Sequence, residues 1–351
     1  MHMADALLSP AVGVTLWAGC AAVLARCARK VRSDGREDLV ARMGVLGAFV
    51  FAAMMINFTI PGTGSSGHIG GALLLSVLLG PHAALVVMAS VLTVQALFFA
   101  DGGLLALGAN IVNVGVFPCF VGYALIYRPL RRRAGAAASR RQLVAITVLS
   151  TVVGSQLGAL GVVLETQLSG ISNLPLASFL WLMQPIHLAI GLMEGLATAA
   201  LVAFVHQARP DLLAAKPSPA NARPALATRW LATTVVLAAL TAGVFSWFAS
   251  TQPDGLEWSI ARIAGAAVPT APVTALHREL ADVQKRVAVF PDYRLATADA
   301  PNNAAAPAWP AVDATTSLAG VVGGAATLAL VSLLAYLMRW RSRRAVSGAE
   351  R

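Results

Sequence analysis

The sequence predicts an all-α integral membrane protein, in which a seven-helix core is followed by a two-helix accessory part. Of its 351 residues, 57% are hydrophobic and only 12% are charged, whereas an ordinary soluble domain is about one quarter charged. The mean hydropathy is +0.71. The apolar residues also fall into long runs, and about twenty such residues in a helix cross a hydrocarbon core of about 30 Å.

About nine apolar runs follow one another along the chain, over 6–27, 39–57, 68–80, 82–100, 104–127, 142–165, 176–205, 227–248 and 316–338. The third run is short for a full crossing. It is separated from the fourth only by the turn Gly80-Pro81. Nine transmembrane helices is therefore the preferred count, and eight or ten remain open.

The net charge of +10 is concentrated between the runs. Four basic clusters lie in the links after the first, fifth, seventh and ninth runs, within 26–42, 128–141, 209–229 and 339–344. With nine crossings all four fall on one side of the membrane, and the positive-inside rule makes that side cytoplasmic. The N-terminus is then outside and the C-terminus inside a bacterial cytoplasmic membrane. The charge reports orientation in lipid and gives no reason to expect nucleic acid.

Pro-rich sequence near 206–226 divides the chain. The expected parts are a membrane core over 1–206, a cytoplasmic linker over 207–226, a two-helix accessory domain over 227–338 with an external loop over 249–315, and a basic cytoplasmic tail over 339–351. Within the external loop, 274–287 has the apolar spacing of an amphipathic helix. The rest of the loop is expected to be extended or poorly ordered.

The chain start has the composition of a metal chelate. The Met1 amine, the His2 amide nitrogen and the His2 imidazole can close two fused rings around one cation. Asp5 and the lack of a basic n-region argue against a cleaved signal peptide, which would remove these groups. A further imidazole would complete an all-nitrogen square, which suits Ni(II), Cu(II) or low-spin Co(II). Metal binding would displace protons from these nitrogens, so the metal affinity should fall as the pH drops through about 6.5.

His68 is the candidate for the fourth nitrogen. The external segment 57–67 before it is rich in glycine and has a proline, so an irregular backbone is expected, and at membrane depth such backbone must line a cavity or be buried in protein. His68 is expected to begin the next span, on the same side of the membrane as Met1. The core is therefore interpreted as a metal-binding domain.

Several polar side chains interrupt the apolar runs. Gln95, Asn110 and Asn113, with Ser66 in the Gly-rich segment, suit an outer layer that orients the ligands. His187 and Glu194 share a helix face, and such groups are costly to bury in a membrane. Hydrogen bonds between helices, a second metal site and a proton path are all open for this pair. The segment 101–103 is interpreted as an external turn, His82 as distant from the site, and His206 and His277 as solvated.

Particular motifs resemble the CbiM/NikM family, the substrate-binding membrane subunits (S-components) of energy-coupling-factor transporters for nickel and cobalt. They are MHMADALLSP at 1–10, GTGSSGHIGG at 62–71, QALFFADGGL at 95–104, ALGANIVN at 106–113 and HLAIGLME at 187–194. The segment QPDGLEW at 252–258 resembles the small NikN-like partner subunit. The resemblance implies Met1, His2 and His68 as metal ligands. It also implies transported Ni²⁺ or Co²⁺ with no prosthetic group, and a coupling (T) protein with ATPase subunits as partners. The chain itself has no Walker A motif and is not expected to be an enzyme.

Two other function classes compete with this interpretation. An intramembrane serine hydrolase would use Ser66 in the short pattern GSSG as nucleophile and His187 as its base. A passive structural membrane protein would leave the Met-His start and the Gly-rich segment without a reason. Nitrogen ligands rank Ni(II) above Co(II), but the sequence does not decide between the two metals.

Overall fold

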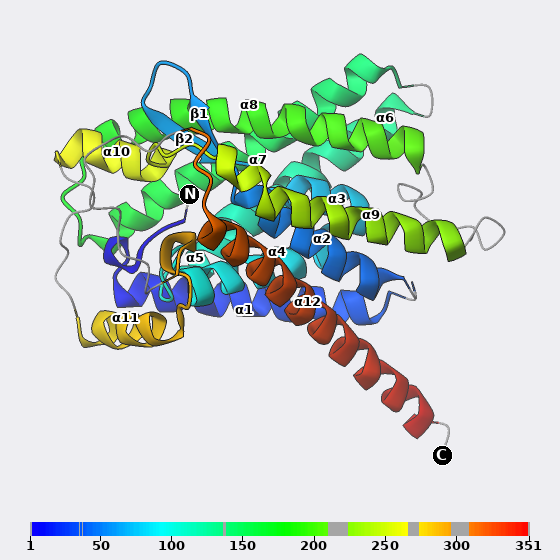
Figure 1. Ribbon diagram of the computed structural model, residues 1–351. Coiled ribbons are helices and arrows are strands. Elements are labelled where there is room, and N and C mark those ends of the chain that lie inside the picture. The colour runs from blue at the N-terminus through cyan, green and yellow to red at the C-terminus, as the bar shows by residue number, and fades with distance from the viewer. Residues whose placement is uncertain are drawn as a thin grey trace.

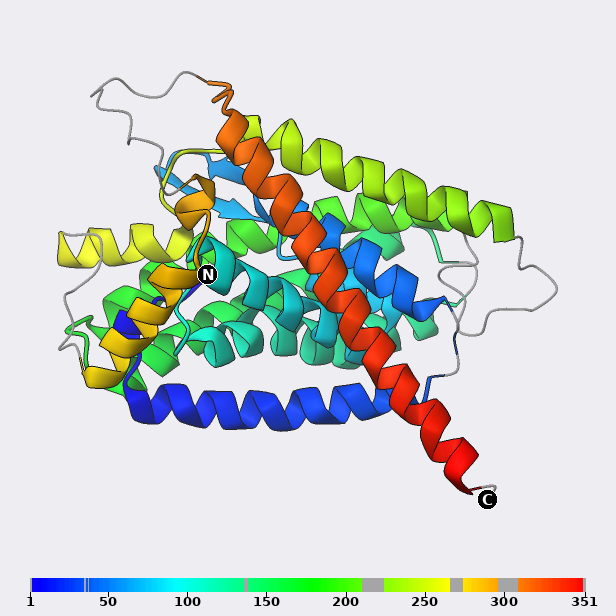
Figure 2. The same ribbon diagram turned by 60° about the horizontal axis from the view of Figure 1, so that its bottom comes forward.

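The computed structural model describes residues 2–34, 36, 38–135, 138–209, 224–265, 274–295 and 309–349. Long helices run side by side in a bundle, and one more helix, α12, crosses it diagonally (Figures 1 and 2). The long elements are α1 Pro10–Arg32, α2 Leu39–Met54, α4 Pro81–Phe99, the π-helical η2 Val112–Tyr127, α7 Arg140–Ser169, α8 Leu176–Ala208, α9 Pro224–Gly243 and α12 Ala314–Ala349. Shorter elements are η1 Asp5–Leu7, α3 Ala72–Leu79, α5 Leu107–Ile111, α6 Arg128–Ala134, η5 Phe245–Phe248, α10 Gly255–Ala264, α11 Ala275–Val287 and η6 Pro291–Tyr293.

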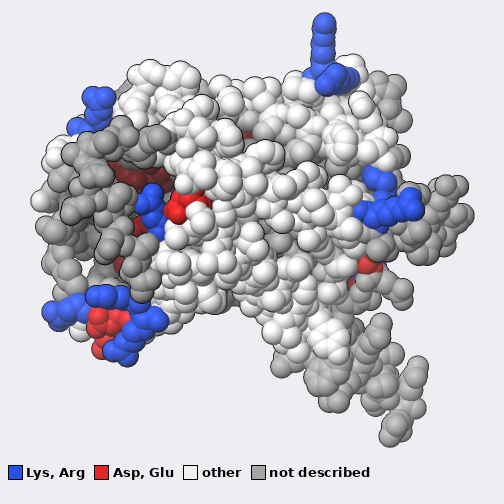
Figure 3. Space-filling model, viewed as in Figure 1, with Lys and Arg blue, Asp and Glu red and all other residues white. Residues whose placement is uncertain are grey.

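The all-α membrane class is confirmed. Within the described chain, 6 helices are long and apolar enough to cross a membrane, and Leu39–Met54 and Arg229–Gly243 are shorter apolar helices. Charged side chains on the visible face gather toward the two ends of the bundle, and a broad band without charge separates them (Figure 3). This is the surface that a bilayer requires of a protein that spans it.

The predicted third span, 68–80, differs from the structure. Its helix α3 has 8 residues, about 12 Å at 1.5 Å per residue, which is too short for a crossing. Gly71 separates it from the preceding strand with a φ of 76°, a conformation that favours glycine. An added Cβ there would lie 2.9 Å from Val50. The short α3 is buried against its neighbours, so it fills the interior of the bundle.

The segment 57–67 is also more regular than predicted. Strand β1, Asn57–Ile60, pairs antiparallel with β2, Ser65–His68, and places Asn57 opposite His68. The expectation that His68 begins a span is therefore wrong, because His68 is the last residue of a hairpin. The hairpin satisfies backbone hydrogen bonds that an irregular loop would leave open.

The accessory part packs on the core. Helices α9 and α12 contact α2, and α12 also contacts α4. Helices α10 and α11 lie at the same end of the bundle (Figures 1 and 2), and α10 contacts the hairpin strand β2. Helix α11 confirms the predicted helix at 274–287, with the Thr274 side chain capping it. Helix α10 corrects the expectation that the chain outside that helix is extended or poorly ordered. Most of the predicted linker lies outside the described residues, and the predicted tail continues α12 as far as Ala349.

Candidate metal centre

The N-terminal segment is fixed to the core by its backbone. The Met3 N–H donates to Asn110 Oδ1 at 2.8 Å, and Asn110 Nδ2 donates back to the Met3 carbonyl at 3.2 Å. That carbonyl also accepts from the Gly103 N–H at 2.9 Å. The Met3 side chain is fully buried in an apolar cluster with Leu7. The predicted role of Asn110 near the site thus takes a specific form: it holds the backbone next to His2.

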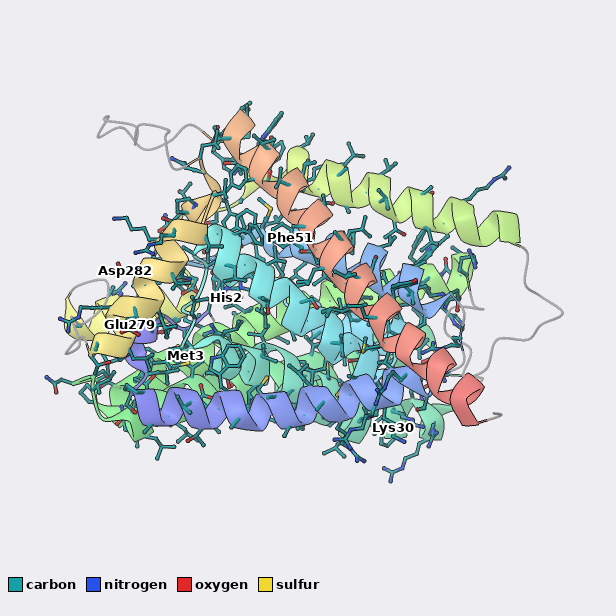
Figure 4. The ribbon with its side chains drawn as sticks, turned by 90° about the horizontal axis from the view of Figure 1, so that it is seen from below. His2, Met3, Lys30, Phe51, Glu279 and Asp282 are labelled. Carbon is teal, nitrogen blue, oxygen red and sulfur yellow. The ribbon has the colours of Figure 1, made fainter. Side chains whose placement is uncertain are left out.

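His2 lies at the end of the bundle that carries α11, whereas Lys30 lies at the opposite end (Figure 4). We call this the His2 end. The rings of His2 and His68 stack with centroids 5.1 Å apart and planes inclined by 7°. Two imidazoles predicted from separate motifs are therefore in direct contact. Met1 lies outside the described residues.

An acidic residue that sequence reasoning passed over joins the pair. The Asp101 Oδ1 atom lies 2.9 Å from His2 Nδ1. Burial alone would raise the pKa of the Asp101 carboxyl, but the His2 imidazole and the Tyr293 hydroxyl hold that pKa below its usual range. Asp101 thus remains a carboxylate at neutral pH and accepts a hydrogen bond from the ring. This is the arrangement by which carboxylates orient histidine ligands.

His68 is held ready as a neutral ligand. Burial, reinforced by positive charge nearby, lowers the pKa of its imidazole to about 3. A metal needs the unprotonated ring, so His68 offers a lone pair throughout the physiological pH range. The Nδ1 atom is 3.4 Å from the Ile69 carbonyl.

The orientation of His2 bears on the predicted chelate. A ring that includes the His2 backbone nitrogen and its own imidazole closes through Nδ1, as a six-membered ring. In the structure Nδ1 pairs with Asp101, and Nε2 is buried with no partner in the described chain. Binding in the chelate mode thus requires a half-turn of the imidazole, which moves Nδ1 away from Asp101 and brings Nε2 to the Asp101 side.

The accessory part contributes directly to this region. Tyr293 donates its hydroxyl to Asp101 Oδ2 at 2.6 Å. Gln284 Nε2 donates to the carbonyls of Ala96 and Gly102, both at 2.8 Å. His277 Nε2 donates to the Leu8 carbonyl at 2.9 Å. The expectation that His277 is solvated is wrong, since it is 7% exposed; His206 is exposed as predicted.

Gly102 allows the chain start and Asn110 to approach the backbone of the turn at 101–103 closely. Its φ is 82°, and an added Cβ would lie 2.8 Å from Asn110 Nδ2 and 3.4 Å from the His2 Cβ. The turn predicted at 101–103 is therefore the place where the chain start, α4 and α5 meet. A larger residue would separate His2 from Asp101.

The remaining predicted outer-layer residues have separate partners. Ser66 donates its hydroxyl to the Gln252 carbonyl at 2.7 Å, so it binds the hairpin to the accessory part. Gln95 Nε2 donates to the Tyr293 oxygen at 3.3 Å and thereby supports the Tyr293–Asp101 contact. Asn113 Nδ2 donates to Glu165 Oε2 at 2.7 Å. His187 and Glu194 lie on α8 and line a cavity that also reaches His68.

The hydrolase alternative finds no support in these contacts. The Ser66 hydroxyl is directed at two backbone carbonyls, of Gln252 and Pro253. The Nδ1 of His187 donates to the Met183 carbonyl at 2.7 Å. A nucleophile needs a base within hydrogen-bond reach, and the described contacts give Ser66 none.

Sequence reasoning missed Asp101, Tyr293 and Asp254. A signal existed for two of them, because Asp101 and Asp254 stand inside the motifs QALFFADGGL and QPDGLEW. Asp254 caps α10 by accepting from the Glu257 N–H at 2.8 Å. No local pattern marks Tyr293. Within the described residues, no three His, Cys, Asp or Glu side chains gather closely enough to hold a metal.

Comparisons with known proteins identify the families that the two parts of the chain resemble. Residues 2–212 match the family model of CbiM, the cobalt uptake substrate-specific transmembrane region, and 228–340 match the PDGLE domain. A protein of Archaeoglobus fulgidus, provisionally named fused nickel transport protein NikMN, is 36% identical over 220 residues, covering 62% of this chain and 70% of that protein. The cobalt transport protein CbiM of Geobacter sulfurreducens is 33% identical over 223 residues, covering 61% of this chain and 62% of that protein.

The chain is also similar in three dimensions to a solved structure of a metal transporter. The crystal structure of a truncated transition metal transporter matches with a TM-score of 0.52 and 32% identity, covering 59% of this chain and 99% of that one.

Proposed function

Because the chain belongs to the CbiM family of cobalt uptake substrate-specific transmembrane proteins, we propose that it captures Ni(II) or Co(II) and delivers the ion across the membrane. It acts as the substrate-binding component of an energy-coupling-factor transporter in a bacterial cytoplasmic membrane. It is a transport protein, and it binds the metal as cargo rather than as a prosthetic group.

The observation that carries this proposal is the stacked pair of His2 and His68 beside the Asp101 carboxylate. His68 is unprotonated at neutral pH, as its lowered pKa of about 3 requires. We assign the ligands as the Met1 amine, the His2 amide and imidazole, and the His68 imidazole. Four nitrogens in a plane suit a d⁸ or low-spin d⁷ ion, and the same ligand set binds Ni(II) more tightly than Co(II). We therefore expect tighter binding of Ni(II) than of Co(II) by the purified protein.

Energy must come from other subunits. The sequence contains no GxxxxGK[ST] motif, which is the loop that cradles nucleotide phosphates in many ATPases. The proposed partners are a transmembrane coupling protein and cytoplasmic ATPases. These proteins would use ATP to release the ion on the cytoplasmic side.

The test is the metal content and nickel affinity of the full-length protein in detergent. Single changes of His2→Ala and His68→Ala should each remove high-affinity Ni(II), and an extra residue before Met1 should do the same. His206→Ala, at an exposed histidine of α8, is the matched control and should bind normally. An octahedral, oxygen-rich nickel spectrum in the unaltered protein would overturn the assignment.

A further inference from the structure

A small cavity connects the candidate metal centre to the interior of the bundle. It has a volume of about 30 Å³ and is lined by His68 on the hairpin, Asn113 on η2, Ser155 on α7, and His187 and Glu194 on α8. About 10–15 Å³ suffices for one water molecule, so the cavity has room for a small ion with little else. Glu194 stands close to the midpoint of Leu176–Ala208. The cavity thus leads from the His2 end toward the middle of the membrane.

His187 lines this cavity, and one of its ring nitrogens has no hydrogen-bond partner in the described chain. Its Nδ1 lies 2.7 Å from the Met183 carbonyl; a carbonyl only accepts, so Nδ1 carries the proton. Nε2 is then left with a lone pair. The residue is 0% exposed, and Nε2 has no hydrogen-bond partner in the described chain. A donated Nδ1–H and a free Nε2 are the state in which histidine commonly binds a metal.

An unpaired acceptor in this position is costly. A buried polar atom without a partner loses about 1–3 kcal/mol relative to water, and a polar group within a membrane helix costs still more to retain. The first residue of α10, Gly255, lies against the ring, since an added Cβ there would be 3.1 Å from His187 Cε1. His187 therefore faces the cavity under a cover supplied by the accessory part.

Glu194 marks the next position inward. It is seven residues beyond His187, which is two helical turns and about 10.5 Å along the axis. One of its oxygens accepts from the Gly71 N–H at 2.8 Å. At this spacing His187 and Glu194 do not bind the same ion at the same time. An ion moving inward would contact His187 first and Glu194 second.

We propose that the cavity is a transient inner site for a divalent transition-metal ion, held by His187 Nε2 together with His68. This inference rests on the proposed transport function and adds a step to it. His68 belongs to both sites, so it remains bound while the ion exchanges its N-terminal ligands for His187. No electrons move: the bond to His187 Nε2 forms, and the bonds to the Met1 amine, the His2 amide and the His2 imidazole break. The amide and amine nitrogens then take up protons from water.

The small number of protein ligands is consistent with transient binding of the ion. Two imidazoles give the ion fewer protein ligands than the four nitrogens of the outer site, because no cluster of three metal-binding side chains exists within the described residues. Such a site binds weakly and releases quickly, as a conducting pathway requires. Glu194 then offers oxygen ligands further inward along the same cavity.

The test separates the inner site from the outer one. In full-length protein carrying His2→Ala, the outer site is removed, and titration with Co(II) should reveal weak binding with a visible absorption spectrum of nitrogen ligation. Adding His187→Ala should weaken that residual binding at least tenfold. His82→Ala in the same background is the control, because His82 lies at the other end of α4, beside Phe120, and it should change nothing.

Folding is controlled by His187→Gln, which keeps a polar side chain of similar reach but offers no imidazole, and by the melting temperature of each variant. Equal Co(II) binding by the His187 and His82 variants would overturn the inner site and leave an ordered water as the partner of Nε2. If instead His2→Ala retained full high-affinity binding, the proposed function would be the part that failed. Cells expressing His187→Ala with the transporter partners should take up nickel at least tenfold more slowly.

Discussion

Tyr293 and Asp101, 192 residues apart, share a hydrogen bond of 2.6 Å between the phenolic hydroxyl and Oδ2 of the carboxylate. The other oxygen of that carboxylate faces His2 at 2.9 Å. A short chain of contacts thus runs from the accessory part through the α4–α5 turn to a candidate metal ligand. The accessory part is therefore structurally continuous with the site.

Tyr293→Phe should weaken nickel binding severalfold. The ring stacks on Phe99 with centroids 4.8 Å apart, and this packing survives the change, whereas the hydroxyl that orients Asp101 is lost. Isothermal titration calorimetry measures the effect. Tyr336→Phe, at an exposed tyrosine of α12, is the matched control. Identical affinities for the two variants would show that the hydroxyl does not position Asp101.

Asp101→Asn should weaken binding by about 10–100-fold, the usual effect of losing a carboxylate that orients a histidine ligand. The amide is of equal size but brings no negative charge to the bound cation. The control is Asp282→Asn on α11, an exposed carboxylate at the same end of the molecule. A similar loss in both variants would point to a general charge effect.

The pH dependence should differ from that expected of two ordinary histidines. A free histidine gains its proton near pH 6.5, but the His68 pKa is lowered to about 3. Between these values His68 stays neutral, so a metal has no proton to displace from it. Acidification from about pH 7 to 5 should weaken binding through the other nitrogens only. An NMR titration of the metal-free protein checks this, and a His68 ring that protonates near pH 6 would contradict it.

Asn110→Ala should lower both nickel affinity and stability. Asn110 exchanges two hydrogen bonds with the Met3 backbone, and the change leaves buried Met3 groups without these partners. The expected loss of stability is about 1–3 kcal/mol, measured by thermal unfolding in detergent. Asn173→Ala, at an exposed asparagine, should alter neither quantity. Unchanged affinity with reduced stability would mean that the anchor matters for folding alone.

Substitution on α1 tests the proposed coupling. Ala18 and Ala22 are exposed on this helix, and small residues at this spacing permit close approach of another membrane helix. Ala18→Leu and Ala22→Leu should reduce uptake in cells while nickel binding by the purified protein stays normal. Unchanged assembly and uptake would exclude this face as the docking surface. Accumulation of nickel against a gradient by the purified chain in liposomes would exclude the need for ATPase partners.

The sequence by itself determined the membrane class, most helix positions and the two histidines of the candidate centre. Each of these depends on a local property: the hydropathy of about twenty consecutive residues, or a short motif around His2 or His68. The same reasoning failed for 68–80, since hydropathy alone does not distinguish a short buried helix from a complete crossing. It also failed to find the hairpin that carries His68, where glycines indicated only irregular backbone.

Only the tertiary structure decided which distant groups surround those histidines. Asp101 reaches His2 because α4 ends there and Gly102 leaves space for the chain start. Tyr293 reaches Asp101 because η6 follows α11 back across the end of the bundle. The Nε2 atom of His187 has no hydrogen-bond partner in the described chain, because Nδ1 donates to the Met183 carbonyl one turn earlier and α10 covers the ring. Contacts of this kind depend on how separate helices pack, and sequence periodicity specifies the buried face of each helix but not its neighbour.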